Sequence, residues 1–364
     1  MKLREITNYL ESFAPLAYQE SYDNSGLICG HHDMEITGAV ICLDSTEAVI
    51  EEAIANKCNL VIAHHPIVFS GIKKFNGKNY VERVIIKAIQ NNIAIYAAHT
   101  NLDNVAKGVN SKIAEKIGLT NCKILAPMYN TLKKLTTFCP DDQAAALRAA
   151  LFAAGGGAIG NYNECSFNTS GLGTFKAGEN TNPFVGEKGK QHEEKETKIE
   201  LIYPGYLESR LLKALFTAHP YEEVAYDIIA LDNANNSIGA GMVGELAEEI
   251  EETIFLKHLK QTMKTDMVRY TALKGKKIKT VAVCGGSGSF LLKNAIAAGA
   301  DVFVTGDFKY HQFFDAENQI VIADIGHYET EQFTMELFYD ILSEKFSTFA
   351  IHLSKINTNP INYL

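Results

Sequence analysis

The feature that most restricts the fold is the alternation of short apolar runs with single amphipathic segments at both ends of the chain. Near the N-terminus, predicted strands at 37–43, 60–63 and 93–98 are separated by predicted helices at 48–55 and 81–90. Strands joined through single helices form right-handed βαβ units and a mostly parallel sheet. The sequence therefore predicts an α/β domain.

The C-terminal part of the chain repeats this rhythm. Strands are predicted at 279–283, 301–305 and 320–323, helices at 290–298 and from about 328 to 346, and a last strand at 348–353. Because the same alternation occurs twice, we interpret the two ends of the chain as related halves of one α/β domain.

The middle of the chain has a different pattern. It contains predicted strands at 131–138, 198–203 and 224–231, helices at 144–154 and 206–218, a hairpin at 165–175 and a polar loop at 184–196. The order βαββαβ is typical of a ferredoxin-like domain. The predicted fold is a split parallel-sheet α/β domain with an inserted ferredoxin-like α+β domain. The expected boundaries are 1–130, 131–233 and 234–364.

Composition and charge exclude several classes of protein. No apolar run approaches the roughly 20 residues that span a membrane. The net charge of −9 opposes non-specific binding to a phosphate backbone, so nucleic acid is not an expected partner. Seven cysteines, odd in number and without a CxxC pair, favour reduced thiols. Since the N-terminus also lacks an apolar signal core, we expect a cytoplasmic protein.

Histidines and carboxylates follow the ends of three predicted strands that lie far apart in sequence. His64 and His65 follow the first of these strands, Asp103 comes shortly after the second, and His327 and Glu331 follow the third. Ligands gather at the carboxyl ends of parallel strands, so these residues are expected to converge. Imidazole and carboxylate together suit zinc, iron or manganese better than calcium.

The spacing of these residues favours two metals over one. Adjacent histidines such as His64 and His65 reach two neighbouring ions more naturally than a single ion, since successive strand residues face opposite sides. His327 and Glu331 are four residues apart and share one helical face. Carboxylates bridge paired metals about 3.5–4 Å apart and a bridging water there becomes a nucleophile. Each of these features has a structural explanation when it is taken singly: His64-His65 as a structural pair, His327 and Glu331 as a surface pair, and Asp103 as a helix cap. Their joint placement favours a metal site.

Five motifs in order carry a family resemblance. They are Tyr22-Asp23-Asn24-Ser25-Gly26-Leu27, Ala63-His64-His65-Pro66, His99-Thr100-Asn101-Leu102-Asp103, Thr305-Gly306-Asp307 and Gly326-His327-Tyr328-Glu329-Thr330-Glu331. The chain resembles the Nif-three-like dinuclear metal-centre family, also called type 2 GTP cyclohydrolase I homologues. Its middle segment resembles the PII/CutA-like insert of the longer bacterial members. Tyr22 departs from the tryptophan usual in the family, and this change affects no ligand.

The resemblance implies a set of metal ligands. It assigns His65 and Asp103 to one metal and His64 and His327 to the other, with Glu331 as the bridge. Two divalent ions per chain are implied, with zinc as the first choice and iron or manganese as alternatives. No catalytic residue is assigned, and no organic cofactor is expected.

The resemblance also implies a function. It points to a metal-dependent hydrolase in which water attacks the purine ring of GTP and formate leaves, with a small-molecule substrate, possibly a nucleotide. The alternative is a metal-binding regulatory or sensing module, gated by the PII-like insert and without this activity. A toroidal homohexamer is implied as well. A nucleic-acid scaffold inside such a ring is a third hypothesis, which the acidic balance opposes.

Other candidates have weaker patterns. His99, His311 and Asp307 belong to the same strand-end neighbourhood and either orient water or substrate or support the metal ligands. The loop 284–289 is either a phosphate cradle or a plain tight turn. Asp44 falls in a predicted helix-capping segment, 44–47. The segment 219–223 is interpreted as a helix stop.

Overall fold

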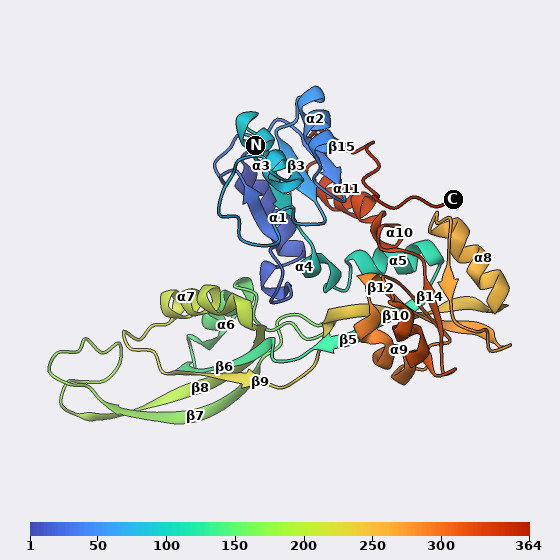
Figure 1. Ribbon diagram of the computed structural model, residues 1–364. Helices are drawn as coiled ribbons and strands as arrows, with labels where there is room; N and C mark the ends of the chain where they lie inside the picture. Colours follow the sequence, from blue (N-terminus) through green and yellow to red (C-terminus); the bar gives the residue numbers. More distant parts are fainter. The chain divides into compact units, whose positions relative to one another are not determined.

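The computed structural model describes residues 1–364 and divides into two compact units (Figure 1). The split unit contains Met1–Pro127 and Ser237–Leu364, and the inserted unit contains Met128–Asn236. No helix in the structure has both the length and the apolar character that crossing a bilayer requires.

The first sheet of the split unit draws on both ends of the chain. Its strands, in spatial order, are β1 (Gly26–Cys29), β4 (Ala94–Ala97), β3 (Leu60–Ala63), β2 (Ala39–Cys42) and β15 (Ile351–Leu353). The last four are parallel, and only β1 is antiparallel to its neighbour. Every residue of β2, β3 and β4 is buried, as expected for parallel strands covered on both faces.

Helices from both halves belong to this part of the split unit. They are α1 (Leu3–Phe13), α2 (Glu47–Ala55), α3 (Tyr80–Gln90), α4 (Thr100–Asp103) and α11 (Thr334–Lys345), with the 3₁₀ turn η1 (Leu16–Tyr18). Val49, Val84 and Ala88 from α2 and α3 join the strands in one buried core. The C-terminal strand β15 pairs with β2, so the first sheet contains strands from both ends of the chain.

The second sheet repeats the parallel arrangement. Its strands, in spatial order, are β11 (Arg269–Tyr270), β14 (Val321–Asp324), β13 (Val302–Gly306), β12 (Lys277–Ser287), β10 (Asn235–Glu251) and β5 (Thr120–Met128). Strands β12, β13 and β14 are parallel, whereas β10 and β11 run antiparallel to their neighbours. The prediction of two related α/β halves is confirmed.

The helices of the second half follow the same alternation. They are α5 (Val109–Ile117), α8 (Glu252–Thr262), α9 (Leu292–Ala297) and α10 (His327–Glu331), with the 3₁₀ turns η3 (Ser289–Leu291) and η4 (Tyr310–Ala316). The single helix expected from about 328 to 346 is wrong. A turn at 332–333 separates α10 from α11, and there the side chain of Gln332 donates a hydrogen bond to the Met263 carbonyl.

The inserted unit is one antiparallel sheet with two helices. Its elements are β6 (Leu132–Pro140), α6 (Ala144–Ala153), β7 (Phe167–Lys176), β8 (Gln191–Pro204), η2 (Gly205–Leu207), α7 (Glu208–Ala218) and β9 (Tyr226–Leu231). The strand order β7-β8-β6-β9 is that of a ferredoxin-like fold, as predicted. Leu147, Leu151, Leu211 and Leu215 pack its helices against the sheet.

Two local predictions for this unit are wrong. The hairpin expected at 165–175 is one continuous strand, β7, and its partner β8 begins at Gln191, inside the expected polar loop. Most of β7 and the first half of β8 are exposed or only partly buried. Neither face of the two-stranded ribbon formed by β7 and the first half of β8 packs against a core. Its residues therefore lack the apolar alternation by which strands are recognised.

The helix stop at 219–223 is confirmed, because α7 ends at Ala218. His219 follows it, and its Nε2–H donates to the Phe138 carbonyl at 2.8 Å while its Nδ1 accepts the Tyr221 N–H at 3.1 Å. Both ring nitrogens of the neutral imidazole are therefore used. Burial lowers the pKa of His219 below its usual value.

The inserted unit is expected to lose stability as the pH falls below about 6.5, the ordinary pKa of histidine. Because the folded state lowers the pKa of His219, the unfolded chain takes up this proton more readily. The contribution of His219 is therefore present above the unfolded pKa and is lost as the pH drops. An NMR titration of the imidazole measures this directly, and a midpoint at or above the ordinary value would contradict the expectation.

Candidate metal centre

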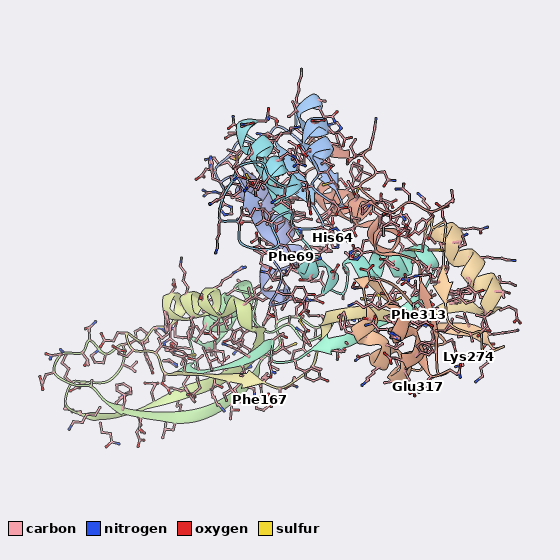
Figure 2. The ribbon with its side chains drawn as sticks, viewed as in Figure 1. His64, Phe69, Phe167, Lys274, Phe313 and Glu317 are labelled. Carbon is pink, nitrogen blue, oxygen red and sulfur yellow. The ribbon has the colours of Figure 1, made fainter.

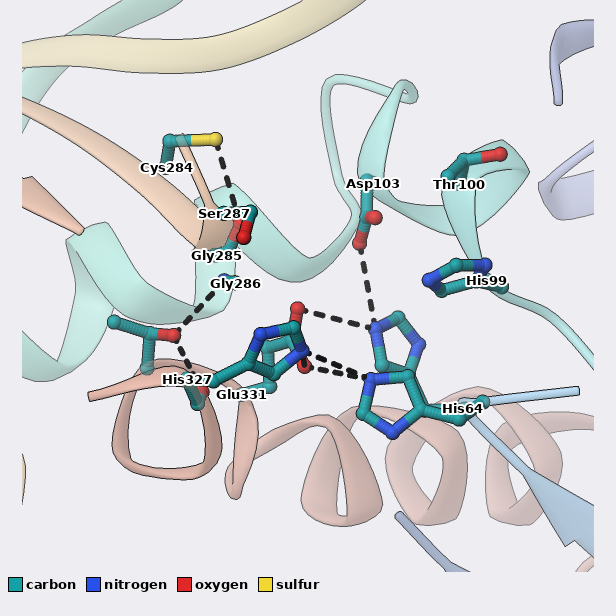
Figure 3. Close-up of polar contacts among 12 residues, drawn as sticks. His64, His99, Thr100, Asp103, Cys284, Gly285, Gly286, Ser287, His327 and Glu331 are labelled. Carbon is teal, nitrogen blue, oxygen red and sulfur yellow. Dashed lines mark hydrogen bonds and ion pairs between the residues drawn. The ribbon is translucent and has the colours of Figure 1, made fainter. Parts of the chain in front are cut away.

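All of the predicted metal ligands lie together in the split unit (Figure 3). His64 and His65 follow β3, Asp103 ends the short helix α4 after β4, and His327 and Glu331 begin and end α10 after β14. Each segment follows the carboxyl end of a parallel strand, but β3 and β4 belong to the first sheet and β14 to the second, so the site draws on the strand ends of both sheets.

Glu331 lies at the centre of the cluster, with its side chain only 3% exposed. Its Oε1 is 3.6 Å from Nε2 of His64. Its Oε2 is 2.9 Å from Nε2 of His65 and 3.1 Å from Nε2 of His327. The two carboxylate oxygens thus face different imidazoles, which is the arrangement that a bridging carboxylate requires.

His64 and Asp103 contain buried polar atoms without a hydrogen-bond partner. Nδ1 of His64 donates to the Ala98 carbonyl at 2.9 Å, so the lone pair of the neutral ring is on Nε2. This Nε2 is 3.6 Å from Oδ1 of Asp103, and neither atom has a hydrogen bond. Leaving such atoms buried and unpaired costs about 1–3 kcal/mol each. An orphaned lone pair beside an orphaned carboxylate oxygen fits a divalent cation.

The Nδ1 atoms of the other imidazoles are held by carboxylates. Nδ1 of His65 is 2.8 Å from Oδ1 of Asp44, and Nδ1 of His327 is 2.7 Å from Oδ2 of Asp307. A carboxylate on Nδ1 fixes the ring so that Nε2 points into the cluster and makes that nitrogen a better ligand. His65 and His327 are therefore oriented in the way that metal-ligating histidines usually are.

The charges in the cluster favour a cation at its centre. Burial opposes ionisation of Glu331, but the imidazoles of His64 and His327 hold the pKa of its carboxyl well below the usual range. Burial and the charge of Glu331 raise the pKa of Asp103. Burial works against protonation of His65 and His327 as well, but the carboxylates around them raise the pKa values to about 10 and about 11.

A fourth imidazole, His99, lies beside the cluster. Its ring centroid is 5.3 Å from that of His64 and 5.4 Å from that of His65, and its Nδ1 contacts Asp23 at 2.8 Å. Hydrogen bonds from His99 and Thr100 outweigh burial and hold the pKa of Asp23 far below its usual value. The structure thus places His99 in the predicted neighbourhood. His311, by contrast, is exposed on η4, where its ring contacts Tyr310 and Phe314.

Sequence reasoning missed the role of Asp44. The predicted helix-capping segment 44–47 is confirmed, since Thr46 caps α2. Asp44 has a different role, because it holds His65 and accepts a hydrogen bond from Thr358. The available signal was its position directly after β2, next to β3, because the same strand-end rule that selected the histidines applies to it.

The segment 284–289 is not a loop, since residues 284–287 are the end of β12 and the chain turns at Gly288 into η3. The backbone N–H groups of Gly285, Gly286 and Gly288 donate to side chains of Asn110, Thr330 and Thr305. Because these amides already have partners within the protein, they are not available to hold a phosphate. The end of β12 instead packs against α10, which carries two of the predicted ligands.

Replacing Gly286 with alanine is expected to lower the free energy of unfolding by about 1–3 kcal/mol. Gly286 has φ +59°, and an added Cβ would lie 2.5 Å from Oε1 of Glu331. Gly299→Ala is the matched control, since Gly299 has φ +72° and no atom within 4 Å of an added Cβ. Urea unfolding of both variants separates backbone strain from the clash, and equal losses would mean that the clash with Glu331 is absent.

An open cavity of about 730 Å³ adjoins the cluster. His65, His99 and His327 line its floor, and Phe69 and Tyr80 are among its apolar walls. Figure 2 labels Phe69 near His64, and the ring centroid of Phe69 is 6.2 Å from that of His99. The cavity has the size typical of small-molecule sites, which is about 300–1,000 Å³.

Comparison with known proteins agrees with this architecture. The family model described as Duf34/NIF3 (NGG1p interacting factor 3) matches residues 1–360. A Bacillus subtilis protein named GTP cyclohydrolase 1 type 2 homolog is 37% identical over 367 residues, covering 99% of this chain and 98% of that protein. A Staphylococcus epidermidis protein of the same name is 36% identical, with 100% of both chains covered.

Two solved structures are similar along the whole chain. A Bacillus cereus protein related to NIF3 has a TM-score of 0.87 and 37% identity, covering 100% of this chain and 99% of that one. A Staphylococcus aureus protein has a TM-score of 0.79 and 30% identity, with the same coverage. The fold and the cluster define a split α/β protein with histidines and carboxylates converging at the ends of its strands. The chain belongs to the Duf34/NIF3 family.

Proposed function

We propose that the chain is a metal-dependent hydrolase that holds two divalent ions with His64, His65, Asp103, His327 and Glu331. The orphaned Nε2 of His64 beside the orphaned Oδ1 of Asp103 carries this proposal, because both atoms offer a lone pair and one bound cation satisfies them together. Divalent ions in such a site act as Lewis acids and generate a nucleophile from water near neutral pH.

Glu331 is the proposed bridge between the two ions, since its oxygens face different imidazoles. The contacts place His64 against Asp103 and His65 against His327. The family resemblance pairs these residues the other way round, and either pairing leaves Glu331 in contact with both ions. Imidazole with carboxylate favours zinc, with iron or manganese as alternatives set by availability.

The proposed substrate is a small molecule with a flat ring, of which GTP is the first choice. Aromatic side chains of Phe69, Tyr80 and Tyr328 line the cavity above the cluster, and a heteroaromatic ring stacks on such surfaces. The relatives named for GTP cyclohydrolase support a nucleotide. One water would add to the purine ring and open it to a formamide, and a second water would hydrolyse this amide and release formate.

His99 is the proposed group for proton transfer. The Asp23 carboxylate holds its Nδ1, so its Nε2 is the nitrogen left for a substrate or water in the cavity that His99 lines. A histidine held in this way presents one nitrogen for proton transfer to and from the substrate.

Formate release from GTP tests the proposal, with protein loaded separately with zinc, manganese and iron. We expect metal-dependent release in the wild type and none in Glu331→Gln. If fully loaded protein releases no formate, GTP is rejected as the substrate. The chain would then be a metal-dependent hydrolase of another substrate, or the sensing module that forms the alternative.

The family resemblance supports a ring-shaped homohexamer as the working assembly. Light scattering coupled to size-exclusion chromatography tests this, because a hexamer has six times the mass of the 40.1 kDa chain. All seven cysteines are free thiols, which supports the cytoplasm as the proposed compartment.

A further inference from the structure

The inserted unit contains a cavity of its own, with a volume of about 390 Å³. It lies between the end of β7, the loop that follows this strand, and the segment that leads into β9. Nothing in the proposed hydrolase chemistry uses this cavity. Its volume falls within the range of about 300–1,000 Å³ that small-molecule sites occupy.

Aromatic rings form much of the wall of this cavity. The ring centroid of Tyr221 is 6.3 Å from that of Phe175 and 6.4 Å from that of Phe184. Phe138 lines the cavity as well. Phe184 is 55% exposed, so part of its ring is open to a ligand. Aromatic rings arranged around one space attract a cation through their negative faces.

A fixed carboxylate lies among these rings. Oε1 of Glu196 accepts the hydroxyl hydrogen of Tyr221 at 2.7 Å, and the side chain of Glu196 is partly buried. An added Cβ at Gly173 would lie 2.1 Å from Oε2 of Glu196. A side chain at position 173 would displace the carboxylate, so glycine on β7 keeps the space into which Glu196 extends.

The remaining charges around the cavity are mostly negative. Glu222 and Glu223 line it together with Glu196, and Lys176 is the only basic lining residue. Oε1 of Glu222 accepts the N–H of Asn182 at 2.7 Å, which ties the loop after β7 to the other wall. This surplus of carboxylates opposes a phosphate-bearing ligand and favours a positively charged one.

We propose that this cavity binds a small organic cation, an amine or quaternary ammonium, with its charge beside Glu196 and its apolar groups against Phe175, Phe184 and Tyr221. The cavity provides both elements by which proteins recognise such cations, which are aromatic faces and a carboxylate. The inference is independent of the hydrolase proposal, since no residue is common to the two sites.

Titration calorimetry of the full chain tests the proposal with choline and phenethylammonium as cations. The matched control ligand is the uncharged isostere of choline, in which a tert-butyl group replaces the trimethylammonium group. We expect at least one cation to bind saturably, and choline to bind roughly tenfold tighter than its isostere, because the aromatic faces and the Glu196 charge attract only the cation. Tyr221 resonances should shift in NMR spectra when the cation is added.

Glu196→Gln is expected to remove most of this preference, because it keeps the shape of the side chain and removes its charge. Glu193→Gln is the matched control: the same change on the same strand, but on the opposite face of the sheet. Circular dichroism checks that both variants fold. The proposal is overturned if neither cation binds saturably, or if choline and its isostere bind equally. It is also overturned if cation affinity is unchanged in a folded Glu196→Gln variant, or if GTP in place of the cations shifts the Tyr221 resonances.

Discussion

Replacing Glu331 with glutamine is expected to abolish the binding of both metal ions. The substitution preserves the size of the side chain but removes the charge that faces His64, His65 and His327. Both proposed ions depend on this one carboxylate. We expect affinity for each ion to fall by at least about 100-fold, the upper end of what loss of a merely supporting partner causes.

Elemental analysis of metal per chain measures this loss. Glu329→Gln is the matched control, since Glu329 is buried on the same helix but contacts Asn359 and Tyr363 instead of the cluster. The control should retain its metal. Equal metal content in wild type and Glu331→Gln would remove Glu331 from the site.

The second large effect is expected from Asp307→Asn. Asp307 holds Nδ1 of His327 and also accepts a hydrogen bond from Ser287. Its charge stabilises a cation on the far side of the ring. The same charge also favours a competing proton on His327, but a doubly charged ion gains more from it than a proton does. Metal affinity is therefore expected to fall by about 10–100-fold.

A competition assay with a chelating dye measures the affinity of each variant. Asp315→Asn serves as the control because Asp315 is exposed on η4, away from the cluster. Asp44→Asn should behave like Asp307→Asn, since Asp44 does for His65 what Asp307 does for His327. Affinity that is unchanged in both Asp44→Asn and Asp307→Asn would show that neither carboxylate supports a metal ligand.

The parallel strands β2, β3, β4, β13 and β14 could be predicted from sequence because they are short, apolar and fully buried. The strands β1, β5, β10 and β11 were not predicted, since they are antiparallel or partly exposed strands without a continuous apolar run. The rule that ligands gather at the carboxyl ends of parallel strands predicts that His64, His65, Asp103, His327 and Glu331 converge. The residues do converge, but the strand ends belong to two sheets, since β3 and β4 lie in the first sheet and β14 lies in the second. The sequence did not reveal which carboxylate oxygen of Glu331 faces which histidine. That depends on side-chain packing between two sheets, which local patterns do not encode.

The wrong predictions for the inserted unit, a hairpin at 165–175 and a loop at 184–196, have a different physical origin. The ribbon of β7 and β8 is exposed, so its strands have no apolar alternation, and Gly171 in the middle of β7 resembles a turn residue. Pairing across the strands, from Phe167 with Glu200 to Lys176 with Gln191, overrides this local signal. Gly173 has a tertiary reason to be glycine, because the Glu196 carboxylate occupies the space beside it.

The most direct test of the proposed centre is anomalous diffraction from crystals of the zinc-loaded protein, measured at the zinc absorption edge. We predict two peaks among His64, His65, Asp103, His327 and Glu331, and the peak positions decide between the two pairings of these ligands. Fully loaded protein with one peak there, or with its peaks elsewhere in the molecule, would contradict a dinuclear centre at this site.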